Sequence, residues 1–144
     1  MSAMSKVLEV AGVLEKSPRL AAFCADKGFD SLRVVYPADV MNPEGEQEAP
    51  WIVLNPESGS GGQDTEKTTS VIGLDVGITE EDARIGSHVA DEFFKLVMDV
   101  LVRSNINLSF VDYDFEVTER APLRIVYSDV YFKNSRPTGR GNII

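Results

Sequence analysis

The chain has 144 residues, a length typical of one domain that forms its own hydrophobic core without disulfides or metal ions. Hydrophobic residues make up 43% and charged residues 26% of the chain, which is the balance of an ordinary globular protein. The 23 acidic and 14 basic residues give a formal net charge of -9. This charge argues against a generic nucleic-acid-binding protein, because such a protein needs a basic surface to contact phosphates.

The single cysteine, Cys24, excludes an intrachain disulfide and a zinc site built from cysteines. Its apolar neighbours predict a small buried side chain. The charged residues near the N-terminus argue against a signal peptide, and the apolar run over residues 96–102 is too short to cross a membrane. We therefore expect a soluble, intracellular protein.

Residues 5–27 are predicted to form two helices. The first has an apolar face at helical spacing, formed by Val7, Leu8, Ala11 and Leu14. Ser17 suits the N-cap of the second helix and Pro18 its first position. Gly28 is placed to end that helix in a left-handed conformation.

Short strands are expected over residues 32–36 and 51–54, the second ending at Asn55-Pro56. A longer strand is expected over residues 68–78, because its apolar residues alternate with Gly and Asp. The Gly- and Ser-rich composition of residues 57–64 predicts a flexible loop, and we expect residues 56–68 to be mobile in the isolated subunit.

A long helix is predicted to begin at residues 79–82 and to end near Ser104. One side of it carries Ile85, Val89, Phe93, Leu96, Val97 and Val100. A second side carries Phe94, Met98, Leu101 and Val102. A helix that is apolar on two sides needs cover on both, so we expect the N-terminal helix or another subunit to supply it.

The last two strands are expected to form a hairpin over residues 111–117 and 123–132, with its turn at residues 120–122. The second of these strands is apolar on both faces and is therefore expected to be central in the sheet or part of an interface. Residues 133–144 contain three basic residues and no acidic one, which predicts a flexible basic arm after a single domain over residues 1–132.

The sequence offers no convincing catalytic constellation. Its only histidine, His88, follows Ser87 on the long helix, where neighbouring side chains point in different directions. Asp112, Asp114 and Glu116 share a strand face that magnesium or calcium could bind weakly, although a solvated face is the simpler interpretation. We therefore expect no enzymatic activity, no cofactor and no metal ion.

The order of the elements carries more information than any one residue. An N-terminal helix, a short strand and a Pro-rich loop precede a strand that opens with Ala49-Pro50-Trp51-Ile52-Val53-Leu54. An alternating strand and one long helix then lead to a hairpin that ends with Leu123-Arg124-Ile125-Val126-Tyr127-Ser128-Asp129-Val130. Over about residues 5–132 this pattern resembles the tail-terminator or tail-completion proteins of long-tailed bacteriophages, the minor tail protein U type.

The resemblance implies an α+β fold, with a mixed or mainly antiparallel sheet of about four to five strands and with the long helix and the N-terminal helix packed on it. It also implies a homohexameric ring in the virion, at the head-proximal end of the tail tube, assembled in the host cytoplasm. Such a ring ends tail polymerisation and provides a head-joining surface. Its partners would be the tail tube protein and a head-completion or connector protein, while DNA passes through without specific binding and no membrane is involved.

We expect the subunits to meet each other or the tail tube through the sheet edge, the final hairpin and the arm. The candidate interface residues are Arg120, Arg124, Tyr127, Val130, Phe132, Arg136 and Arg140. Arg120 and Arg124 would pair with acidic residues of the adjacent chain. The acidic row formed by Asp112, Asp114 and Glu116 would face solvent or the channel, where its charge keeps DNA from adhering.

Two other classes of protein remain open at this point. One is a cytosolic, dimeric adaptor or a small-ligand-binding α+β domain without catalysis. The other is a small hydrolase built on His88 or on the face with Asp112, Asp114 and Glu116. The oligomeric state separates a ring from a dimeric adaptor, and metal titration with activity screens tests the hydrolase.

Overall fold

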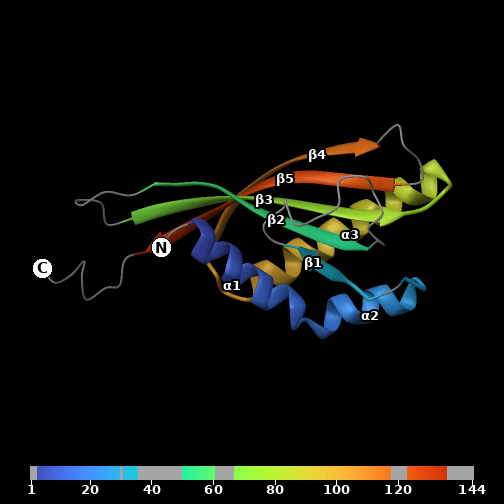
Figure 1. Ribbon diagram of the computed structural model, residues 1–144, viewed down its shortest axis with the longest axis horizontal. Coiled ribbons are helices and arrows are strands. Elements are labelled where there is room, and N and C mark those ends of the chain that lie inside the picture. Colours follow the sequence, from blue (N-terminus) through green and yellow to red (C-terminus); the bar gives the residue numbers. More distant parts are fainter. Residues whose placement is uncertain (1–2, 30, 36–49, 61–66, 118–122, 136–144) are drawn as a thin grey trace, which may run out of the picture.

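The computed structural model describes residues 3–29, 31–35, 50–60, 67–117 and 123–135. Its elements are α1 (Ala3–Glu15), α2 (Pro18–Asp26), β1 (Arg33–Val35), β2 (Trp51–Ser60), β3 (Lys67–Thr79), α3 (Ala83–Arg103), β4 (Leu108–Val117) and β5 (Leu123–Ser135) (Figure 1). The strands form one sheet in the order β1-β2-β3-β5-β4. Only β1 and β2 pair in parallel, so the sheet is mixed. The predicted α+β fold is confirmed.

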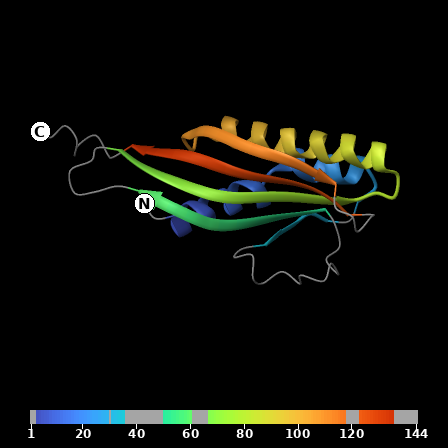
Figure 2. The same ribbon diagram turned by 90° about the horizontal axis from the view of Figure 1, so that it is seen from above.

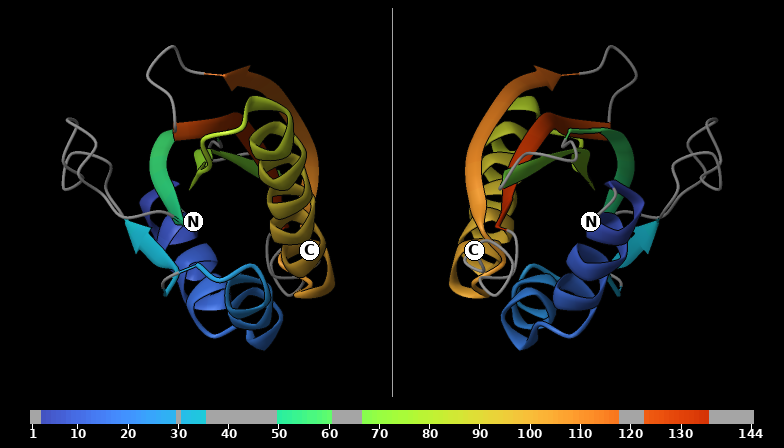
Figure 3. Two further views of the ribbon diagram at one scale, coloured as in Figure 1. Left: turned by 90° about the vertical axis from the view of Figure 1, so that its right-hand side faces the viewer. Right: turned by 90° about the vertical axis from the view of Figure 1, so that its left-hand side faces the viewer.

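The hydrophobic core lies between one face of the sheet and the helices. Seen along the long axis of the molecule, the sheet curves around α1 and α3 (Figure 3). The sheet contributes a set of buried apolar side chains: Ile52, Leu54, Ile72, Leu74, Val76, Ile78, Val126, Val130 and Phe132. We call this helix-covered side the inner face and the opposite side the outer face (Figure 2).

The two N-terminal helices form as predicted. The buried face of α1 consists of Val7, Val10, Ala11 and Leu14. Leu8 was expected on this face but is 51% exposed. It follows Val7 directly, and neighbouring residues of a helix lie about 100° apart around its axis, so Leu8 points away from the buried face. The Ser17 side chain accepts a hydrogen bond from the backbone N–H of Leu20, Pro18 begins α2, and Gly28 has a φ of 76°.

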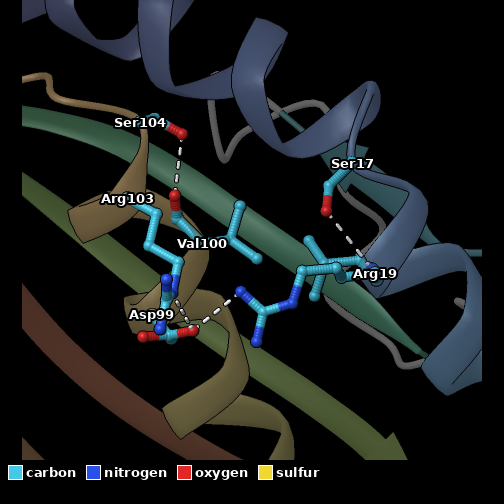
Figure 4. Close-up of polar contacts among 7 residues, drawn as sticks. Ser17, Arg19, Asp99, Val100, Arg103 and Ser104 are labelled. Atoms are coloured by element: carbon cyan, nitrogen blue, oxygen red, sulfur yellow. Dashed lines mark hydrogen bonds and ion pairs between the residues drawn. The ribbon is translucent and has the colours of Figure 1, made fainter.

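Helix α3 also has the predicted ends. Asp82 is its N-cap and accepts hydrogen bonds from the backbone N–H groups of Arg84 and Ile85, and Ser104 is its C-cap. An ion pair of 2.7 Å between Arg19 and Asp99 ties α2 to α3, and Arg103 contacts the same carboxylate at 2.9 Å (Figure 4). The hydrogen bonds from these two arginines lower the pKa of Asp99.

Cover for α3 comes from the sheet and from both N-terminal helices. Phe93 of α3 stacks on Phe23 of α2, with ring centroids 5.4 Å apart. Ile85 and Val102 were expected on the apolar sides of this helix, yet they are 53% and 59% exposed in the single chain.

Strand β2 is longer than the sequence predicts. It continues through Asn55 and Pro56 to Ser60, and its register to β3 shifts between Pro56 and Ser58. A bulge tolerates proline, which lacks the N–H that a regular ladder needs. The prediction of a flexible loop is therefore wrong for residues 57–60, and residues 61–66 lie outside the described residues.

Strand β5 lies between β3 and β4, which confirms the predicted hairpin and the predicted central position. It extends to Ser135, so residues 133–135 belong to the sheet and not to an arm. The remainder of the predicted arm, residues 136–144, and the predicted turn at residues 120–122 lie outside the described residues.

Candidate functional site

The outer face of the sheet has an apolar part and an acidic part. The apolar part contains Trp51, Val53 and Ile125, all at least 93% buried. The indole N–H of Trp51 has no hydrogen-bond partner among the described residues. The acidic part carries five carboxylates from four strands, and we call these residues the acidic patch: Glu57, Asp75, Asp112, Asp114 and Asp129.

Strand register brings these carboxylates together. Asp112 of β4 lies directly opposite Asp129 of β5, and Gly73 of β3 lies opposite Asp129 on its other side. Asp114 lies opposite Tyr127, whose side chain is 38% exposed. Like charges directly across a strand pair destabilise a sheet, so this arrangement costs the fold free energy.

The patch surrounds an open depression of about 240 Å³. Gly73 forms part of its floor, and the carboxyl of Glu57 lies so close that a Cβ at Gly73 would be 2.7 Å from Oε2. Glu57 is the bulge residue of β2, placed between the pairs Pro56↔Ile72 and Ser58↔Val71. The bulge and the missing side chain at Gly73 together let a carboxyl lie flat on the sheet.

The ladder between β3 and β5 is interrupted beside this depression. Residue pairing ends at Gly73↔Asp129 and resumes in the same register at Val76↔Val126. At the interruption the hydroxyl of Ser128 donates a hydrogen bond to the carbonyl oxygen of Leu74. The backbone N–H of Ser128 donates to the carboxylate of Asp75.

Two carboxyls of the patch have strongly raised pKa values. Desolvation, the hydrogen bond to Asp129 and the nearby negative charges raise the pKa of Glu57 to about 7. Desolvation and the charge of Asp129 raise the pKa of Asp75 to about 6, although the hydrogen bond from Ser128 acts in the opposite direction. Near neutral pH the patch therefore holds protons that isolated carboxylates would release.

No basic side chain of the described chain balances the patch. Every ion pair among the described residues joins side chains of the helices or of the C-cap of α2. Within the same residues, no group of three or more His, Cys, Asp or Glu side chains has a geometry that could hold a metal ion. The patch is thus a surface that attracts positive charge, without a formed metal site.

The structure corrects the role expected for Arg124. Its side chain is 2% exposed, and its guanidinium donates hydrogen bonds to the carbonyl oxygens of Glu80 (3.1 Å) and Glu81 (2.9 Å). Arg124 therefore ties the start of β5 to the turn before α3 within one subunit. It is not available for an ion pair with a neighbouring chain.

Val130 and Phe132 were also expected at an interface, and both have 0% exposure in the core. Both residues pack in the core beneath the helices, so the prediction that they contact another subunit is wrong. Tyr127 is on the surface, at the acidic patch. Arg120, Arg136 and Arg140 lie outside the described residues, and so does the side chain of Glu116.

The residues considered for catalysis are not brought into one site. His88 is exposed on α3, whereas Cys24 is buried on α2. Burial raises the pKa of the Cys24 thiol, which makes it a poor nucleophile. Asp112 and Asp114 are exposed together on β4, on the opposite side of the sheet from the helices.

The sequence interpretation missed Glu57, Asp75 and Asp129 as parts of a site. Asp75 lies between the buried apolar residues Leu74 and Val76, so the alternation itself was the available signal that it points outward. Asp129 lies between the buried residues Ser128 and Val130, so its apolar pattern was weaker.

No helix in the described part of the chain is long and apolar enough to cross a membrane. No protein-family model and no curated protein matches the chain.

Proposed function

We propose that the protein is a non-catalytic structural subunit of a phage or prophage tail, which forms a ring at the head-proximal end of the tail tube. In this role it ends tail polymerisation and offers a surface for head joining. The observation that carries the proposal is an open sheet with the ten-residue strand β4 at one edge. The α+β architecture agrees with the subunit that the sequence resemblance implies.

Strand β4 pairs on one side only, with β5, among the described strands. An unpaired edge is a template for pairing with another chain, and a closed ring uses this edge without open-ended growth. A symmetric pairing of β4 with β4 would bring the acidic residues of two copies together. This charge repulsion favours a head-to-tail contact between different surfaces, which is the contact type that builds rings.

The charge of the whole chain supports a passage for DNA. A net charge of -9 per subunit gives a ring a strongly negative field. Such a field repels phosphates, so a genome can slide through without adhering to the wall.

A matched pair of variants tests the edge contact. Tyr113 on β4 is 46% exposed, with its ring also packed against Phe94 of α3 at a centroid distance of 4.8 Å, and Leu8 on α1 is 51% exposed. We expect Tyr113→Lys to prevent assembly and Leu8→Lys to leave it intact, measured as mass by light scattering over a concentration series. Assembly of Tyr113→Lys to the wild-type mass would contradict an interface at β4.

The second candidate function is a dimeric adaptor or small-ligand-binding domain. It is favoured by a pocket of about 360 Å³ lined by Leu14, Cys24, Phe29 and Leu32, among others. A mass of two chains at every concentration, together with binding of an apolar small molecule in this pocket, would support this function over a ring.

A further inference from the structure

The acidic patch lies on a sheet face that no helix of the described chain covers. The helices pack on the inner face (Figure 3). Asp129 has Asp112 directly opposite and also shares a hydrogen bond with Glu57. Packing does not require acids at these outward positions, and a partner with positive charge would remove their repulsion.

The chain itself contains a segment of complementary charge. Residues 136–144 include Arg136 and Arg140 and no acidic residue. They follow β5 directly, the strand that carries Asp129. Nine residues span at most about 30 Å when extended, which is long enough to cross the face of an adjacent domain.

Geometry prevents Arg136 from reaching the patch of its own chain. Asp129 and Ser135 are six residues apart on one strand, a distance of about 20 Å. Arg136 follows Ser135 immediately, and an arginine side chain is much shorter than this distance. Arg136 can therefore contact this patch only when the patch belongs to another copy.

We propose that the acidic patch of one subunit binds the basic C-terminal segment, residues 136–144, of a neighbouring copy. Asp112 and Asp114 are the main acceptors, because both are exposed and their side chains lie two residues apart on one face. Tyr127, opposite Asp114, offers an aromatic ring against which a guanidinium can stack. This inference rests on the proposed ring, which supplies the neighbouring copy. It assigns Asp112 and Asp114 to a contact with that copy, in place of an uncovered position that faces the channel.

A synthetic peptide of residues 133–144 tests the contact directly. The receptor is the full-length chain with Arg136→Ala and Arg140→Ala, so that the segments of other receptor copies do not compete with the peptide. We expect the labelled peptide to bind at low salt, measured by fluorescence anisotropy, and to dissociate at high salt. Asp112→Asn with Asp114→Asn should weaken binding on the order of ten-fold. The control Glu15→Gln with Asp26→Asn removes two exposed acids of the helices and should leave the affinity unchanged.

The outcomes separate this inference from the proposed function. Peptide binding that is lost in the Asp112 and Asp114 variant supports the inference, even if the wild-type chain never forms a ring. A ring that persists in the Arg136 and Arg140 variant, with no peptide binding, overturns the inference and leaves the proposed function standing. Peptide binding that is equal in the patch variant and in the control also overturns it.

Discussion

The side chain of Arg124 lies across Gly86, so close that a Cβ at Gly86 would be 2.8 Å from both Cγ and Nε. This contact guides the guanidinium to the two carbonyl oxygens that precede α3. It joins the first residues of β5 to the first turn of the long helix. The absence of a side chain at position 86 is therefore part of how the helix is positioned on the sheet.

Arg124→Met is expected to lower the free energy of unfolding by about 1–3 kcal/mol, because two carbonyl oxygens lose their donor and the packing over Gly86 changes. Urea denaturation measures this loss. Arg103→Met is the matched control, since Arg103 forms an exposed ion pair that contributes less than about 1 kcal/mol. An equal effect of the two substitutions would contradict the structural role of Arg124.

Gly77→Ala is expected to destabilise the protein by about 1–3 kcal/mol through overpacking. The indole ring of Trp51 lies directly over Gly77, and a Cβ there would overlap with the ring atoms. Gly12→Ala is the control, because nothing lies within 4 Å of a Cβ at that position of α1. It should raise stability by about 0.5–1 kcal/mol through helix propensity. Thermal unfolding of the two variants should move in opposite directions.

The acidic patch predicts a specific dependence of stability on pH. The pKa of Glu57 rises from 4.5 to about 7 on folding, and that of Asp75 from 3.8 to about 6. At pH values between the unfolded-state and folded-state pKa of each group, the folded state holds more protons than the unfolded state. The contribution of the two groups to stability is therefore fully present below pH 4 and is lost as the pH rises to about 7.

Glu57→Gln should remove part of this dependence. At pH values above 7 the variant is expected to be more stable than the wild type, on the order of 1 kcal/mol after allowance for solvent screening of this exposed carboxyl. Below pH 4 the two proteins should be equally stable. Denaturant unfolding over a pH series measures the difference, and a constant difference at all pH values would contradict the assignment.

Much of the fold could be predicted from the sequence because local signals are strong. Ser17, Pro18 and Gly28 mark the ends of α2, and Asp82 marks the start of α3. The end of β2 was predicted too early, because Pro56 is a reliable strand breaker except at a bulge, and a bulge depends on the partner strand.

The site could be predicted only in part. Both faces of β5 are apolar in sequence, so periodicity could not tell that Val130 and Phe132 face the core while Tyr127 faces outward. The acidic patch depends on long-range register, which sets Asp112 opposite Asp129. No local pattern carries that register, so the sequence predicted the acidic row on β4 but not the residues that complete the patch.

Electron microscopy of the purified full-length chain at high concentration tests the ring most directly. We expect class averages of closed rings with six-fold symmetry and a central opening. The Tyr113→Lys variant should give single subunits under the same conditions, and Leu8→Lys should give the same rings as the wild type. Wild-type particles that remain monomers or two-fold dimers at every concentration would contradict the account and would favour the dimeric adaptor.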